Sequence, residues 1–216
     1  MTTADRRDRE RQQRQNDILD AAEAVFAAKG VRNATIDDVA ERAEVSKGTI
    51  YLYFKSKEML YMGMGLRASR ILMERFTRAA ASETVGLAKV TAIGRSYYDF
   101  CFEYPNYFKA MLYIDNFDAA THAAIQDEPM AREAHAVGQA SLKVLSDCIE
   151  IGIEDGSISR DVNPAEMAVM LWAQSNGVIQ MLKNSKEHFK LHGQEIGSLF
   201  DDFLVYMERG LTPQPN

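Results

Sequence analysis

The sequence predicts an all-α protein, because apolar residues recur with the helical period and prolines stand near expected helix starts. Hydrophobic residues make up 46% of the 216 residues and charged residues 26%, as in globular proteins with a packed core. No sustained alternation of apolar and polar residues predicts a β-sheet. The charged start of the chain does not resemble a signal peptide, and no run of about 18 apolar residues predicts a membrane span. We therefore expect a cytoplasmic protein.

The first expected helix carries one apolar stripe from Ile18 to Phe26, with the spacing i, i+1, i+4, i+7 and i+8. Gly30 follows where a left-handed residue would end the helix. Thr35 then suits the N-cap of a second, short helix, whose first turn contains two aspartates that the helix dipole favours. These signals predict two helices joined by a short connection.

A tight turn at residues 43–45 leads to Ser46, a good N-cap for a third helix that ends at Tyr53. So short a helix is unstable alone, and it must be held by packing. Ser56 caps a fourth helix over residues 57–81, in which two early glycines favour a bend. The first third of the chain therefore contains a compact group of short helices.

The rest of the chain is also predicted to be helical. The expected helices cover residues 84–104, 105–114, 118–127, 129–155, 164–184 and 194–210. Three prolines lie near their starts, where proline is tolerated. We expect an N-terminal domain over residues 1–57 and a C-terminal helical bundle over residues 58–216, linked through the fourth helix.

The charges are distributed unevenly along the chain. The net charge of −6 argues against non-specific binding to nucleic acid. Residues 1–67, however, hold 12 Lys and Arg against 11 Asp and Glu, so the acidic excess lies in the later two thirds. Five arginines between residues 6 and 14 alternate with acidic residues. They form either a solvated helical extension or an arm that reaches the minor groove or flanking phosphates.

The third helix has a polar surface once its core positions are set aside. The residues that remain are Ser46, Lys47, Gly48, Thr49, Tyr51 and Tyr53. Small and hydroxyl-bearing side chains with one cation suit hydrogen bonding to base edges and phosphates. Gly48 removes side-chain bulk, which lets the helix backbone approach a groove. Lys57 stands at the start of the fourth helix, where a cation and free backbone N–H groups can share a phosphate.

A larger pattern surrounds these residues and covers about residues 14–62. It is carried by Ile18, Leu19, Ala22, Phe26, Gly30, Thr35, Ile36, Val39, Ala40 and the run from Val45 to Leu60. This pattern resembles the TetR family of transcriptional repressors. The resemblance implies that helices two and three form a helix-turn-helix and that the third helix enters the major groove. With Ser46, the residues it implies at operator DNA are Thr35, Lys47, Gly48, Thr49, Tyr51, Tyr53 and Lys57.

One residue departs from the family pattern, because Glu44 occupies a turn position where the family usually carries glycine. If this position requires a positive φ, glutamate there costs about 1 kcal/mol.

The resemblance also implies that the C-terminal domain dimerises through its last two helices. Both carry apolar stripes that permit such pairing, although packing inside one subunit explains each stripe equally well. The expected interface residues are Met170, Gln174, Val178, Met181, Leu199 and Phe203.

An aromatic segment over residues 97–108 suggests a ligand cavity in the same domain. The expected ligand-binding residues are Tyr97, Cys101, Tyr104, Phe108, Met111, Phe117, Trp172 and Asn176. An ordinary core explains the same aromatic residues. The effector is expected to be apolar or amphipathic, while Cys101 and Cys148 are expected to be buried free thiols, with a redox switch as the alternative.

No enzymatic site is expected. His188 and His192 stand four residues apart but lack the pattern of a zinc protease, and no set of nucleophile and base is recognisable. We expect no cofactor and no metal. The favoured interpretation is a homodimeric repressor that a small molecule releases from a palindromic operator. The alternative is a helical protein-interaction module, or a small-molecule-binding protein without DNA-binding activity.

Overall fold

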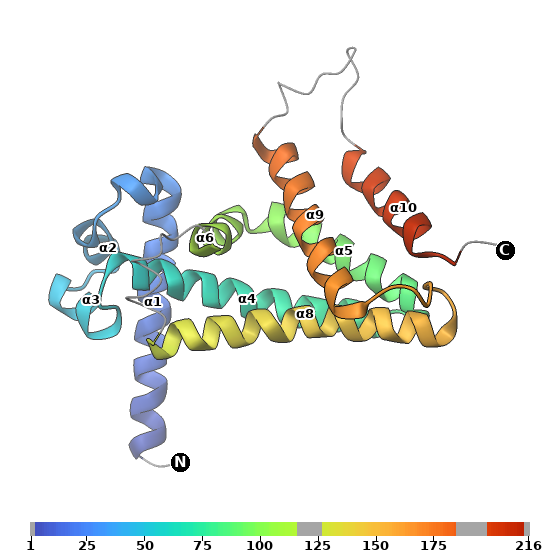
Figure 1. Cartoon of the computed structure of the whole chain (residues 1–216). Helices are drawn as coiled ribbons and strands as arrows, with labels where there is room; N and C mark the ends of the chain where they lie inside the picture. The colour runs from blue at the N-terminus through green and yellow to red at the C-terminus, as the bar shows by residue number, and fades with distance from the viewer. Residues whose placement is uncertain (1–2, 116–126, 185–197, 214–216) are drawn as a thin grey trace. The chain divides into compact units, whose positions relative to one another are not determined.

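The computed structural model describes residues 3–115, 127–184 and 198–213. Every regular element in these residues is an α-helix, which confirms the predicted fold class (Figure 1). The chain divides into two compact units. The N-terminal unit contains Met1–Ala68 and Pro105–His135, and the C-terminal unit contains Ser69–Tyr104 and Ala136–Asn216. A segment from the middle of the chain therefore belongs with the first helices.

The N-terminal unit is built on α1, α2 and α3, with the start of α4. These helices span Thr3–Asn33, Ile36–Arg42, Lys47–Tyr53 and Lys57–Ala81. Figure 1 shows α2 beside α1 and α3 beside α2. Inside α1, Gly30 has φ 74° and ψ 151°, so the regular helix breaks at the predicted glycine. The core of this unit contains the fully buried side chains Ile18, Ala22, Val39, Ile50 and Leu60.

Helix α4 continues without interruption from Lys57 to Ala81. A Cβ atom at Gly63 would lie 2.8 Å from Cε1 of Phe54 and 3.0 Å from Cδ2 of Leu19. This glycine therefore lets Phe54, just after α3, and Leu19 of α1 pack closely against α4.

Two further helices contribute to the N-terminal unit, α6 (Pro105–Asp115) and the start of α8 (Pro129–Asp155). Arg67 on α4 holds α1 and α6 together. Its guanidinium donates to Asp20 Oδ1 at 2.5 Å, to the Tyr107 hydroxyl at 3.2 Å and to the Asn16 carbonyl oxygen at 3.1 Å. A single arginine thus satisfies acceptors on two neighbouring helices.

The C-terminal unit contains α5 (Gly86–Glu103), most of α8, α9 (Pro164–Asn184) and α10 (Leu199–Leu211). Helix α5 begins directly against α8, because a Cβ at Gly86 would lie only 2.1 Å from the backbone nitrogen of Gly152. The Asp155 carboxylate accepts the Gly86 N–H at 2.7 Å and so satisfies a free donor of the first turn. Figure 1 shows α9 and α10 side by side.

The helices predicted over residues 129–155 and 164–184 coincide with α8 and α9. The helix expected over residues 118–127 lies, apart from its last residue, outside the described residues. None of the helices in the described part of the chain is both long and apolar enough to cross a membrane.

Candidate nucleic-acid interface and ligand cavity

Local hydrogen bonds start both short helices of the N-terminal unit. The Thr35 hydroxyl accepts the Asp38 N–H at 3.2 Å, and the Asp38 carboxylate accepts the Thr35 N–H at 2.9 Å. This reciprocal capping box satisfies two backbone donors. The Ser46 hydroxyl accepts the Thr49 N–H at 3.0 Å and caps α3 in the same way. Both predicted N-caps are confirmed.

The turn between α2 and α3 has an unusual backbone. Among the residues that the structure describes, Glu44 is the one non-glycine with a positive φ, at 54°. Its N–H donates to the Glu41 carbonyl at 3.1 Å, and the Val45 N–H donates to the Ala40 carbonyl at 3.0 Å. The left-handed conformation costs a non-glycine residue roughly 1–2 kcal/mol. Glu44, which stands where the family usually carries glycine, therefore does occupy a position with a positive φ.

Helix α3 buries one face and exposes the other. Ile50 is fully buried, and Phe54, just past the helix, is 1% exposed. The α3 outward face consists of the exposed residues Lys47, Gly48, Tyr51 and Leu52. Because α3 is capped and its other side is buried through Ile50 and Phe54, the outward face lies on a well-packed helix.

Leu52 is 77% exposed and was not among the residues expected at DNA. The sequence does carry a signal for its position, since a residue two places after the buried Ile50 lies near the opposite side of a helix. An apolar side chain on such a surface can contact the methyl group of thymine.

The other expected DNA contacts surround the α3 outward face. Thr35 and Ser46 are exposed, whereas Thr49 and Tyr53 are half-buried at its edge. The hydroxyls of Ser46 and Thr49 lie 2.9 Å apart and share a hydrogen bond. The Arg11 guanidinium carbon lies 6.0 Å from the centre of the Tyr53 ring.

Two expected phosphate ligands have partners within the chain. The Lys47 ammonium donates to the Asp37 carboxylate at 2.8 Å, and this hydrogen bond raises the pKa of Lys47. Exposed ion pairs contribute at most about 1 kcal/mol, so a phosphate can replace Asp37 at little cost. Lys57 donates to the carbonyl oxygens of Val31 and Ala34, which leaves one of its three N–H protons for DNA.

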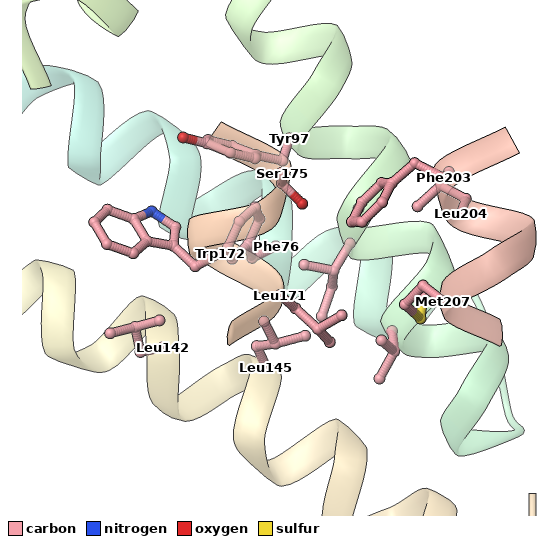
Figure 2. Close-up of a pocket in the computed structure, with 13 residues that line it drawn as sticks. Phe76, Tyr97, Leu142, Leu145, Leu171, Trp172, Ser175, Phe203, Leu204 and Met207 are labelled. Carbon is pink, nitrogen blue, oxygen red and sulfur yellow. The ribbon is translucent and has the colours of Figure 1, made fainter. Parts of the chain in front are cut away.

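A cavity lies within the C-terminal unit, where Figure 2 shows side chains of α4, α5, α8, α9 and α10 around it. All the space between its lining atoms, together with the solvent at its mouth, amounts to about 430 Å³. None of the 13 described residues that line it is charged. The lining residues that carry polar atoms in their side chains are Tyr97, Trp172 and Ser175. The Tyr97 hydroxyl donates to the side-chain oxygen of the buried Asn176.

The residues expected to bind a ligand are only partly brought together. Tyr97 and Trp172 line the cavity. Asn176 does not line it but accepts the hydrogen bond of the Tyr97 hydroxyl. The remaining expected residues do not line this cavity: Cys101 and Tyr104 lie elsewhere in the C-terminal unit, Phe108 and Met111 belong to the N-terminal unit, and Phe117 lies outside the described residues. Phe76, Leu142 and Phe203 line the cavity without having been expected there. They come from three separate helices, so no local pattern could identify them.

The two cysteines are free and buried, as expected. Burial raises the pKa of the Cys101 thiol to about 12 and also raises that of Cys148. Since the thiolate is the reactive form, burial disfavours redox chemistry at either residue. Within residues 3–115, 127–184 and 198–213, no three His, Cys, Asp or Glu side chains gather as a metal site requires. His188 and His192 lie outside those ranges.

The expected interface residues on α9 share one face. Met170, Gln174 and Met181 are exposed, and Val178 is half-buried. On α10, Leu199 and Phe203 are half-buried. The exposed apolar residues of α10 are instead Val205 and Tyr206, which is 71% exposed.

A helix-turn-helix with an exposed second helix, joined to a helical unit that contains an apolar cavity, defines a DNA-binding transcriptional regulator. Residues 18–62 match the family described as "Bacterial regulatory proteins, tetR family". Residues 90–206 match the domain described as "Tetracyclin repressor-like, C-terminal domain". The chain belongs to the TetR family.

Individual relatives agree with this assignment. The HTH-type transcriptional repressor DhaR of Mycobacterium sp. strain GP1 is 26% identical over 91% of this chain and 91% of its own length. The HTH-type transcriptional activator FasR of Mycolicibacterium smegmatis is 32% identical over 42% of this chain and 41% of its own. The structure of the regulator FadR from Bacillus subtilis in complex with stearoyl-CoA has a TM-score of 0.67 at 18% identity, covering 90% of this chain and 98% of that one. This last likeness concerns the fold.

Proposed function

We propose that this protein is a ligand-responsive repressor, which binds a palindromic operator as a homodimer and leaves it when a small apolar molecule occupies the cavity. The observation that carries the proposal is the α3 outward face, which is exposed while Ile50 anchors the opposite side of α3 in the core. Two such helices, related by a two-fold axis, would enter successive major grooves. Repression is favoured over activation because DhaR, a relative that matches nearly the whole chain, is named a repressor.

The proposed dimer interface is the exposed stripe of α9. Met170, Ala173, Gln174, Gly177 and Met181 follow the spacing i, i+3, i+4, i+7 and i+11, and all are exposed. A Cβ at Gly177 would meet nothing within 4 Å, so this part of the stripe is open in one subunit. Small residues on a helix face permit close approach of a second helix, and exposed methionines gain from being covered.

The proposed effector is largely apolar and uncharged. No side chain that lines the described cavity is charged, so a charged group placed there would lose its hydration without gaining a partner. Ser175 offers one hydroxyl group for a hydrogen bond, whereas the Tyr97 hydroxyl already donates to Asn176. The structure of FadR contains stearoyl-CoA. The acyl chain of such a ligand is apolar, and an apolar group of this kind suits the lining of the cavity.

The test uses the full chain and the DNA upstream of its own gene in fluorescence anisotropy. We expect tight binding by a dimer, and we expect an in vitro transcription assay from that promoter to show repression. An effector that binds the cavity should weaken operator binding by about 5–150-fold, and saturating operator should weaken effector binding by the same factor. No binding at low salt would overturn DNA recognition, and an increase in transcription would overturn repression.

The dimer is tested separately with a matched pair of variants. Met170→Glu places a charge in the α9 stripe and should yield monomers in analytical ultracentrifugation, together with weaker operator binding. Ile151→Glu places the same charge on an exposed apolar position of α8 and should leave the dimer intact. A dimer of unchanged affinity in Met170→Glu would exclude this interface.

A further inference from the structure

Helix α1 extends far beyond the part that packs. It begins at Thr3, whereas its buried stripe begins at Ile18. Residues 5–14 are all exposed. These turns therefore contribute nothing to the core of the N-terminal unit, and the arginines among them are available to a partner.

The arginines of this extension differ in their surroundings. Arg6 donates to the Glu10 carboxylate at 2.8 Å, and Arg9 donates to the Asp5 carbonyl oxygen at 3.2 Å. The other three, Arg7, Arg11 and Arg14, follow the spacing i, i+4 and i+7 and so lie along one side of the helix. We call these three the arginine stripe.

The arginine stripe has one member beside the end of α3. Arg11, its middle member, lies with its guanidinium carbon 6.0 Å from the centre of the Tyr53 ring. Tyr53 is the last residue of α3. Within the N-terminal unit the middle of the stripe therefore adjoins the surface that is proposed to contact DNA, and Arg7 and Arg14 flank it along the same side of α1.

We propose that the arginine stripe binds the phosphates of operator DNA beside the bases that α3 contacts. This proposal rests on the proposed function. A helix with its side chains is about 10–12 Å wide, whereas the minor groove of undistorted B-DNA is about 6 Å wide, so phosphate contacts fit the helical extension better than insertion into that groove. Arg7 and Arg14 are about 10 Å apart along the helix axis, which corresponds to about three base-pair steps. Three arginines thus match the phosphates of a short backbone segment.

Contacts of this kind act through charge and are independent of base sequence. Each neutralised phosphate releases counterions, so affinity falls more steeply with salt when the stripe is engaged. The stripe supplies affinity and orientation, while the α3 outward face supplies sequence recognition. The overall charge of −6 makes such a local positive surface more important for approaching DNA.

The test compares two double variants that remove the same charge from the same helix. Arg7→Gln with Arg11→Gln removes two members of the stripe, and Arg6→Gln with Arg9→Gln removes the two arginines with partners inside the helix. Binding of the full-length chain is measured by fluorescence anisotropy between 50 and 300 mM salt, on an operator with about ten flanking base pairs and on one trimmed to the recognised bases. Circular dichroism verifies that α1 stays helical.

We expect the stripe variant to bind the flanked operator at least about tenfold more weakly, with a salt slope shallower by about one unit for each lost phosphate contact. On the trimmed operator it should differ little from the wild type, and the control variant should resemble the wild type on both. Equal effects of the two variants, or equal loss on both operators, would overturn the role of the stripe while leaving operator binding intact. Failure of the wild type to bind either operator would overturn the proposed function as well.

Discussion

The Lys57 ammonium donates a hydrogen bond to the carbonyl oxygen of Val31 at 2.9 Å, and a second one to that of Ala34 at 3.2 Å. Both acceptors follow Gly30, where the helical backbone of α1 is broken. A lysine at the start of α4 therefore satisfies carbonyl groups at the end of another helix. Lys57 is also expected to bind a DNA phosphate, so its ammonium group would serve both the fold and DNA binding.

Replacing Lys57 with alanine should affect both roles. Two carbonyl groups lose their charged donor, so the free energy of unfolding should fall by about 1–3 kcal/mol in urea titrations. The remaining folded protein should bind all DNA sequences more weakly by a similar factor, with a salt slope shallower by about one unit. A change confined to one base position would contradict a phosphate contact, and unchanged stability would contradict the contact with α1.

Gly48 offers a substitution that separates folding from DNA binding. A Cβ at this position would meet Ser46 Oγ at 3.6 Å, an ordinary contact, and would project from the α3 outward face. Gly48→Ala should therefore preserve stability or raise it by up to about 1 kcal/mol, since alanine favours the helix. It should weaken operator binding on the order of tenfold, or about 1.4 kcal/mol, because the added methyl group holds the backbone away from the groove.

The matched control for this variant is Gly138→Ala in α8, where an added Cβ would meet nothing within 4 Å. It should show the same gain in thermal stability and bind the operator like the wild type. Normal operator affinity in Gly48→Ala would show that the backbone of α3 does not approach DNA closely.

The features that could be predicted from sequence depend on neighbours along the chain. The N-caps Thr35 and Ser46 bond to groups three residues away, and Gly30 needs only its own backbone conformation. Helix boundaries marked by proline, as at Pro129 and Pro164, were equally predictable. In each case the physical cause acts within one helical turn, so the sequence contains the whole signal.

The features that could not be predicted depend on which helices meet. The acceptors of Arg67 lie 40 to 51 positions away along the chain, on α1 and α6. The aromatic segment after Tyr97 looked like one cavity wall, but Phe108 lies in the other unit because a new helix begins at Pro105. The number of aromatic residues in a segment does not indicate which of them belong to the N-terminal unit and which to the C-terminal unit, because that depends on how the helices pack.

The pKa of Asp38 predicts a specific acid sensitivity. The hydrogen bond from Lys29 and those from Thr35 lower its pKa from 3.8 to about 2. Because the folded-state pKa is the lower one, this carboxylate stabilises the fold above pH 4, and its contribution is lost as the pH falls from about 4 to 2. Asp38→Asn should therefore be less stable than the wild type in urea at pH 5, and the difference should shrink towards pH 2. A constant difference across this range would contradict the assignment.

Glu44 predicts a gain in stability from a single substitution. Its φ of 54° is unfavourable for a side chain with a Cβ, whereas glycine adopts this conformation freely. Glu44→Gly should raise the free energy of unfolding by roughly 1 kcal/mol, after the entropic cost of glycine in the unfolded chain is included. For a protein of this size the midpoint of thermal unfolding should rise by about 2–4 °C.

The control for Glu44→Gly is Glu41→Gly, which places glycine within α2 three residues earlier. Glycine in a helix is unfavourable by about 0.5–1 kcal/mol, so this variant should be less stable than the wild type by a similar amount. Both variants remove one glutamate charge. If Glu44→Gly raises the free energy of unfolding and Glu41→Gly lowers it, the difference must come from the backbone conformation at the two positions. If both variants lost stability, Glu44 would not adopt the left-handed conformation in solution. Operator affinity should stay unchanged in Glu44→Gly, because the turn keeps its geometry and α3 keeps its orientation.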